Sequence, residues 1–202
     1  NRMSQVLNID YIFTDNQGND LLFNGFQKRL ATKHSYIFRI SINDYTAIQN
    51  QFSHGEKATE SEFSQLRNYT IDYIENESEV TFQPTTEWQG NLSYIFSQKE
   101  NATSNKISEN ETERLDGHTF GADIQWSSSN SQKLSGGVKY VKNAYTGVSE
   151  SPAGYEMLNG LRPGKNILWN LSWNQLLNNG FQINLRYDGR SVEGNERIIH
   201  TG

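Results

Sequence analysis

Two sets of alternating glutamates are the residues best placed to do chemistry in this chain. They are Glu75, Glu77 and Glu79 in one segment and Glu109, Glu111 and Glu113 in another. Carboxylates at every second strand position share one face, where they would suit Ca²⁺ binding or the acid/base pair of a glycoside hydrolase. An acidic, solvated edge explains both sets more simply, because charges on edge strands resist the addition of further strands. No carboxylate pair for glycoside cleavage can be located, so we expect no catalytic residues.

The histidines and the absence of cysteine add no further chemistry. His34, His54, His118 and His200 are scattered, and none has a second ligand at the spacing of a metal site. The chain contains no cysteine, which excludes disulfides and thiolate metal sites. The sequence alone supports no Ser-His-Asp or Cys-His arrangement, since only a fold can bring such groups together. We therefore predict no metal, no cofactor and no enzymatic activity.

Aromatic residues are the remaining candidates for a functional surface. With ten Tyr and ten Phe in the chain, the tryptophans could form a platform for sugar stacking, an interfacial girdle or a core. Their regular alternation with apolar neighbours favours burial or lipid contact over an open sugar-binding face. The residues we assign to an aromatic girdle or binding surface are Trp88, Trp126, Trp169, Trp173 and Tyr187.

The segment from residue 167 to residue 188 shows which elements must position these side chains. Apolar and polar residues alternate through residues 167–174 and again through 181–188, with a turn at Asn178-Asn179-Gly180. A period of two is typical of a strand, and two strands joined by a short Asn-Gly turn make an antiparallel hairpin. The apolar residues predicted to share one face are Ile167, Trp169, Leu171, Trp173, Phe181, Ile183, Leu185 and Tyr187.

The same alternation recurs along the chain and predicts about nine to eleven strands. Phe120, Ala122, Ile124 and Trp126 should pair, across a turn at residues 127–131, with Leu134, Gly136, Val138 and Tyr140. A final short strand is expected between Glu196 and His200.

Five polar or glycine-rich stretches are expected to interrupt the strands. The run at residues 98–117 is predicted to be a long, mobile, solvent-exposed loop that contributes nothing to fold stability, because it has almost nothing to bury. The others are a turn at residues 15–19, a basic helix-compatible stretch at 28–33, a loop or short helix at 56–68, and an ordered loop at 147–164.

These patterns predict one all-β domain over residues 1–202. We expect an antiparallel up-and-down meander of long strands, forming an outer-membrane β-barrel or a large sheet, although a β-sandwich would show the same period. Hydrophobic residues are only 34% of the chain and the mean hydropathy is −0.76. No segment approaches the roughly 18 apolar residues of a membrane helix, and the net charge of −5 argues against a nucleic-acid partner.

The C-terminal third resembles a known group of proteins. The run from Ser151 to Trp173 (SPAGYEMLNGLRPGKNILWNLSW), followed by LRYDGRS and IIHTG, is similar to the C-terminal region of large Bacteroidota outer-membrane or cell-envelope β proteins. The upstream segment from Glu79 to Asn101 also resembles a strand, proline, strand and polar loop unit of that group. The resemblance implies an outer-membrane or envelope location and a loose association with type IX secretion, and it carries no catalytic residues. Members of the group usually end with one more strand, so we expect this chain to be a fragment of a larger envelope protein.

Together these observations predict a non-enzymatic structural segment of an outer-membrane β protein, as a component of a secretion or transport complex. The alternative is a soluble periplasmic or surface β-domain that binds a protein or glycan partner, such as an accessory or plug subunit of a secretion channel. The expected partners are outer-membrane lipid or other envelope proteins. The apolar strand faces should discriminate the two, since a barrel turns them to lipid and a soluble domain covers them with a second layer.

Overall fold

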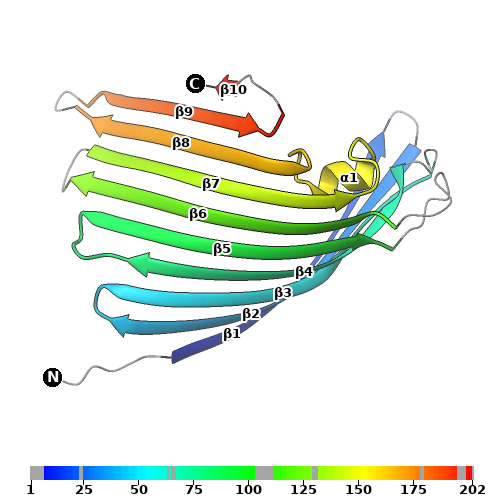
Figure 1. Ribbon diagram of the computed structural model, residues 1–202, viewed down its shortest axis with the longest axis horizontal. Helices are drawn as coiled ribbons and strands as arrows, with labels where there is room; N and C mark the ends of the chain where they lie inside the picture. The colour runs from blue at the N-terminus through cyan, green and yellow to red at the C-terminus, as the bar shows by residue number, and fades with distance from the viewer. Residues whose placement is uncertain are drawn as a thin grey trace.

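The computed structural model describes residues 7–22, 25–62, 64, 67–102, 112–128, 132–177, 180–194 and 199–201. In these residues, ten antiparallel strands form one sheet, with a single short helix (Figure 1). The strands are β1 (Leu7–Leu22), β2 (Gly25–Asn43), β3 (Thr46–Ser61), β4 (Tyr69–Phe82), β5 (Trp88–Asn101), β6 (Arg114–Ser128), β7 (Gln132–Thr146), β8 (Gly164–Leu176), β9 (Gln182–Val192) and β10 (Ile199–Thr201), and the helix is α1 (Pro152–Met157).

Every strand pairs with its neighbours in the sequence, so the sheet order is β1 to β10 without a crossover. The predicted all-β, antiparallel meander is therefore confirmed. The described strands form an open, strongly curved sheet with β1 and β10 at opposite edges, so the large sheet is present and a closed barrel is not.

Both predicted hairpins have the expected pairing. In β8 and β9, Leu171 lies opposite Tyr187 and Trp173 opposite Leu185. In β6 and β7, Trp126 lies opposite Leu134 and Phe120 opposite Tyr140. Residues that lie opposite each other in neighbouring strands point to the same face, so the alternation in the sequence fixes this register.

Three expected interruptions are wrong because the strands are longer than their apolar segments. Residues 15–19 continue β1, residues 28–33 lie within β2, and residues 56–61 complete β3. These extensions are polar because they carry the strands beyond the apolar zone, where both faces of the sheet can be polar. Backbone pairing with long neighbouring strands holds them extended despite their loop-like composition.

The stretch from residue 98 to residue 117 is also partly strand. Residues 98–101 end β5 and residues 114–117 begin β6, while residues 103–111 lie outside the described residues. Leu115 is only 2% exposed and belongs to the core. The prediction that this stretch contributes nothing to stability is therefore wrong at its C-terminal end, because a single apolar residue in a polar run can be fully buried.

A short helix lies in the stretch at 147–164 that was expected to be a loop. The Ser151 side chain accepts a hydrogen bond from the Gly154 backbone N–H, and Pro152 occupies the first turn, where its missing N–H costs nothing. The helix buries Ala153, Met157 and the following Leu158 against Ile71 of β4 and Leu115 of β6. Figure 1 shows α1 seated in the trough of the curved sheet, near the end at which the long connections lie.

The last described strand, Ile199–Thr201, overlaps the strand expected at 196–200 and pairs with residues 188–190 of β9, while residues 196–198 lie outside the described residues.

Candidate functional site

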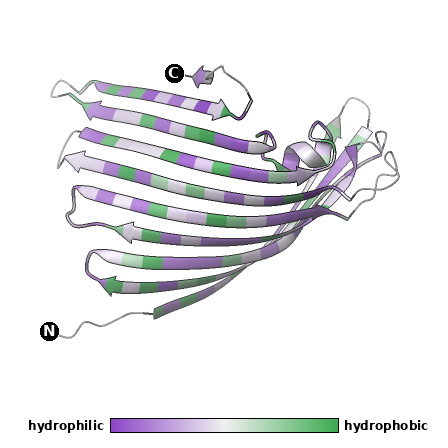
Figure 2. Ribbon diagram, viewed as in Figure 1, coloured by the Kyte–Doolittle hydropathy of each residue, from purple (hydrophilic) through white to green (hydrophobic). Residues whose placement is uncertain are grey.

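The two faces of the sheet differ in composition and in what covers them. One face, here called the polar face, lines the trough and carries α1. The opposite face, here called the apolar face, has no layer over it in the described part of the chain, and many of its large side chains are exposed. Figure 2 shows the hydrophobic and hydrophilic residues that alternate along the strands and so separate onto these faces.

A continuous row of mostly apolar residues crosses nine strands of the apolar face. Each member lies opposite the next in the register of the sheet, and we call this set the central row. Its members, from β1 to β9, are Leu7, Ile40, Ile48, Val80, Leu92, Ala122, Val138, Trp169 and Gly189.

No charge interrupts this part of the apolar face. On the apolar face, the central row contains no described Asp, Glu, Lys or Arg. The same is true of the two neighbouring rows of this face, which lie two positions along each strand on either side of it. On β5 the aromatic and apolar stretch runs from Trp88 to Phe96, and charge returns at Glu100. At about 3.3 Å per residue, this stretch is roughly 26 Å long. We call the whole charge-free zone the apolar band.

The boundary of the apolar band crosses the strands obliquely. On β3, β4 and β5 the first charged residues toward the long connections are Glu56, Asp72 and Glu100, which lie opposite one another, each eight positions from the central row. On β7 and β8 they are Lys142 and Lys165, only four positions from it. This boundary therefore moves along the strands toward the short turns between β3 and β8.

All five residues predicted as a girdle or binding surface lie on the apolar face. Trp88 and Trp126 lie opposite each other with ring centroids 6.3 Å apart. Trp173 continues their row through Leu134, and Trp169 lies in the central row. The Trp169 indole covers Gly189, where an added Cβ would come within 2.3 Å of its ring. The structure thus brings these residues onto one exposed surface, and their role remains a prediction.

One polar cluster interrupts the apolar face on β3 and β4. The Asn50 Nδ2 donates to Asn76 Oδ1 at 3.2 Å and to Ser78 Oγ at 2.9 Å. These side chains satisfy one another, which lowers the cost of removing them from water.

The four histidines, which are scattered in the sequence, also lie on the apolar face. Three of them contact a tyrosine of the neighbouring strand through Nδ1. These pairs are Tyr11 with His34 (2.9 Å), Tyr94 with His118 (2.9 Å), and Tyr187 with His200. The fourth, His54, stacks on His34 with ring centroids 4.8 Å apart. No group of three or more His, Asp or Glu residues in the described chain could hold a metal ion.

The glutamates of β4 share one face, as predicted, but their expected position at a sheet edge is wrong. Strand β4 is an interior strand, paired with β3 and β5, and Glu75, Glu77 and Glu79 point from it to the polar face. Of the second set, Glu113 accepts a hydrogen bond from Ser151 Oγ at 2.6 Å. Glu109 and Glu111 lie outside the described residues. The β4 set is therefore not an acidic edge, and Glu113 anchors the start of α1.

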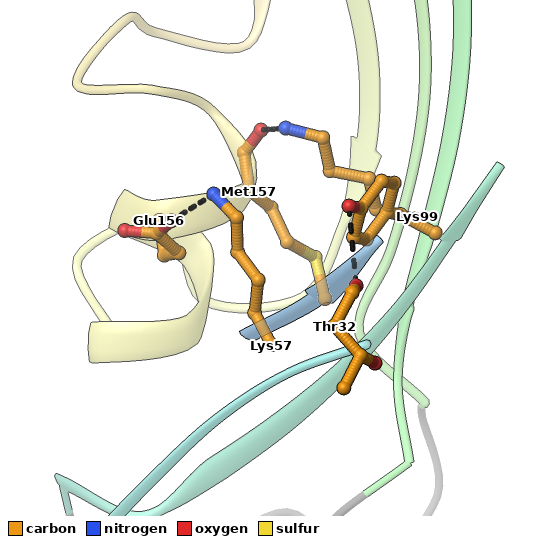
Figure 3. A network of polar contacts seen from close by, with 6 residues as sticks. Thr32, Lys57, Lys99, Glu156 and Met157 are labelled. Carbon is orange, nitrogen blue, oxygen red and sulfur yellow. Dashed lines mark hydrogen bonds and ion pairs between the residues drawn. The ribbon is translucent and has the colours of Figure 1, made fainter. Parts of the chain in front are cut away.

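Two lysines of the polar face fix the helix. Lys57 Nζ of β3 lies 2.7 Å from Glu156 Oε1, and Lys99 Nζ of β5 donates to the Met157 carbonyl at 2.8 Å (Figure 3). A cation beside the last carbonyls of a helix is favourable, because these carbonyls have no partner within the helix. Burial alone would lower the pKa of Lys57, but the hydrogen bond and charge of Glu156 outweigh it, so the pKa is raised.

Tyr145, near the end of β7, completes the support of this helix. Its hydroxyl donates to Glu113 Oε1 at 3.2 Å, and its ring packs against the core beneath α1. Burial and, after it, the negative charge of Glu113 raise the pKa of Tyr145 to about 12. The tyrosine therefore stays neutral and able to donate at physiological pH.

A cavity of about 460 Å³ lies further along the polar face, between β6 and β9. The charged and polar residues that line it are Asp123, Lys139, Asn170, Asp188 and Arg190. Asp188 is already paired with Arg186 of its own strand at 2.7 Å. The lining therefore suits solvation of a polar surface and presents no nucleophile with an adjacent base.

Comparison with known proteins gives no assignment. No protein-family model matches the chain, and a search of curated proteins finds no similar sequence. No helix in the described residues is long and apolar enough to cross a membrane.

Proposed function

We propose that this chain is a non-catalytic, structural segment of a bacterial outer-membrane β protein. Its apolar face contacts lipid, and its polar face, with α1, is turned away from the lipid toward water or other protein. Its mechanism is passive, because the paired strands form a rigid wall and the connections at the two ends are available to partners. A place in a secretion or transport complex, including type IX secretion, rests on the sequence resemblance alone.

The observation that carries this proposal is the charge-free apolar band on an uncovered face. Monomeric soluble proteins rarely expose contiguous apolar patches larger than a few hundred Å². The band's length along β5 is comparable with the apolar zone of about 25 Å on outer-membrane β proteins. Tryptophans line one side of the band, as expected where a membrane meets water.

The oblique course of the band supports the same interpretation. Strands that cross a membrane as a sheet are tilted by about 35–45°. A zone of constant depth must then move along each successive strand, as the charged boundary does between β3 and β8. A soluble two-layer domain has no reason to keep a charge-free zone of this oblique form.

The proposal requires that the open edges of the sheet are paired in the membrane. Unpaired backbone N–H and C=O groups cost several kcal/mol each in hydrocarbon. Strand β1 therefore needs a further strand beside it, and so does most of β9, because β10 covers only its residues 188–190.

A second candidate is a soluble periplasmic or surface domain whose apolar face is covered by a partner protein. The hydrogen-bonded Asn50, Asn76 and Ser78 on that face favour it, because polar groups are less costly in a protein interface than in hydrocarbon. The two candidates differ in whether lipid alone can satisfy the apolar band.

Vesicle flotation tests the proposal. The full chain, refolded with phospholipid vesicles, should float with them, resist washing with high salt or carbonate, and be released by detergent. A chain that remained monodisperse in buffer without detergent, and did not float, would contradict it. If the chain needed an envelope protein partner for solubility and did not float with vesicles, the result would favour the second candidate.

A further inference from the structure

The Tyr–His contacts repeat across the apolar face with one geometry. In each pair the tyrosine contacts a histidine diagonally, on the neighbouring strand, rather than the residue directly opposite. The pairs join β1 to β2, β5 to β6, and β9 to β10, so the arrangement repeats every four strands, with two strands between one pair and the next. The three tyrosines, Tyr11, Tyr94 and Tyr187, are far apart in the sequence. The arrangement therefore comes from the pairing of the strands and not from a local sequence repeat.

The three pairs follow the oblique boundary of the apolar band. His34 lies six positions from Ile40 of the central row, and His118 lies four positions from Ala122. His200 lies opposite Gly189, within the row itself. The histidines thus shift in the same direction as the charged boundary, and in a sheet of tilted strands they lie at similar depth.

The charged residues beyond the pairs fit a water interface. Asp15 and Glu56 lie on the apolar face beyond His34, and Asp116 with Arg114 lies beyond His118. The pairs that contain His34 and His118 therefore lie between apolar residues on one side and charged residues on the other. Tyrosine and histidine have apolar rings and polar tips, which suits them to such a boundary.

Among the described residues, hydrogen bonding occupies only Nδ1 of these three histidines and leaves Nε2 free for a ligand. When the tyrosine hydroxyl donates to Nδ1, the hydrogen of a neutral imidazole lies on Nε2. The Nε2–H then remains a donor on the exposed face of the sheet. Phosphate oxygens are the strong acceptors at the depth of lipid headgroups.

We propose that the three Tyr–His pairs form a belt that binds the phosphates of lipid headgroups through Nε2 of His34, His118 and His200. The belt marks the membrane surface on the side of the long connections, and the paired Trp88 and Trp126 lie toward the opposite surface. This inference rests on the proposed lipid contact of the apolar face and adds to it the headgroup chemistry and the orientation of the sheet.

Paramagnetic relaxation in vesicles tests the belt directly. The full chain carries labelled histidine, and the nitroxide is placed either on the lipid headgroup or at mid-chain. The imidazole signals of His34, His118 and His200 should lose more intensity with the headgroup nitroxide. Equal loss with both nitroxides, or greater loss at mid-chain, in protein that floats with vesicles would overturn the belt and leave the lipid contact standing. Failure to float would overturn the lipid contact itself.

Variants test the phosphate contact separately. The chain should have a higher Tm in phosphocholine micelles than in maltoside micelles, which lack phosphate, and the triple variant His34→Gln, His118→Gln, His200→Gln should lose this difference. His54→Gln is the matched control, because no tyrosine hydroxyl bonds to His54 among the described residues, and it should keep the difference. If the triple variant does not fold, the variant Tyr11→Phe, Tyr94→Phe, Tyr187→Phe should reduce the difference in Tm between the two micelles. Without the tyrosine hydroxyls, the imidazole hydrogen is no longer held on Nε2. A full difference in either triple variant would overturn the phosphate contact.

Discussion

Residues of the same hydrophobic type have opposite surroundings on the two faces of this sheet. Beneath α1, Met157 is 0% exposed and Leu158 is 2% exposed, whereas Leu92 and Leu185 of the apolar band are 62% and 57% exposed. Full burial of such a side chain stabilises a fold by about 1.5–3 kcal/mol. The core beneath α1 already has this stabilisation from the chain itself, and the apolar band does not. The difference indicates that α1 stabilises the fold, whereas the apolar band gains no such burial from the described chain, which is consistent with the proposed contact with lipid.

Truncation within the core should give the largest effect. Met157→Ala removes a fully buried side chain and should lower the free energy of unfolding by about 2–5 kcal/mol, measured by chemical denaturation in one detergent. Leu171→Ala on the apolar face is the control and should cost much less, because detergent can refill the space. Equal losses for the two variants would show that the two regions are not distinct.

A charge placed in the apolar band should oppose membrane insertion. Leu92→Arg should destabilise the inserted chain by about 2–4 kcal/mol, the usual cost of a cation at the centre of a bilayer. The matched control is Asn91→Arg, the adjacent residue of β5 on the polar face. Partition between vesicles and urea-containing buffer measures both, and similar behaviour of the two variants would argue against lipid at the apolar face.

The contact of Trp169 with Gly189 can be tested by comparing two glycine variants. Gly189→Ala places a methyl group about where the Trp169 ring lies, so it should displace the indole and cost about 1–3 kcal/mol. Gly18→Ala, which has open space around it in β1, should change stability little. Thermal unfolding and the emission wavelength of tryptophan report the two effects, and an unchanged spectrum for Gly189→Ala would exclude the close contact.

The support of α1 should weaken at high pH. Because the folded pKa of Tyr145 is raised from 10.0 to about 12, the folded state holds its proton more tightly than the unfolded chain. This contribution to stability is complete below the unfolded pKa and is lost as pH rises through the folded pKa. Tyr145→Phe should therefore be less stable than the parent chain at about pH 9, with a smaller difference at about pH 11. A difference that did not change with pH would remove Glu113 and burial as the cause.

Much of the fold could be predicted from the alternation of residue types, and its limits have a physical cause. The register that places Trp126 opposite Leu134 follows from apolar residues at every second position. The strand ends at residues 15–19 and 56–61 lack this signal, because Ala58 is the only apolar residue in them. Their extended conformation comes from pairing with distant strands, which local composition does not record.

The candidate surface could likewise be predicted only in part from the sequence. The tryptophans could be assigned to one face from the sequence, since alternation alone decides it. The Tyr–His pairs could not, because Tyr94 and His118 meet only once β5 and β6 are aligned. The ion pair between Lys57 and Glu156 that holds α1 could not be predicted for a similar reason, since the two residues are brought together by a helix shorter than two turns.

Quenching of the intrinsic tryptophan fluorescence tests the central claim most directly. All four tryptophans, Trp88, Trp126, Trp169 and Trp173, lie on the apolar face, so no engineered probe is needed. In vesicles, lipids with brominated acyl chains should quench this fluorescence, and aqueous acrylamide should have little effect. Strong quenching by acrylamide, with none by the brominated lipids, would contradict contact between the apolar face and lipid.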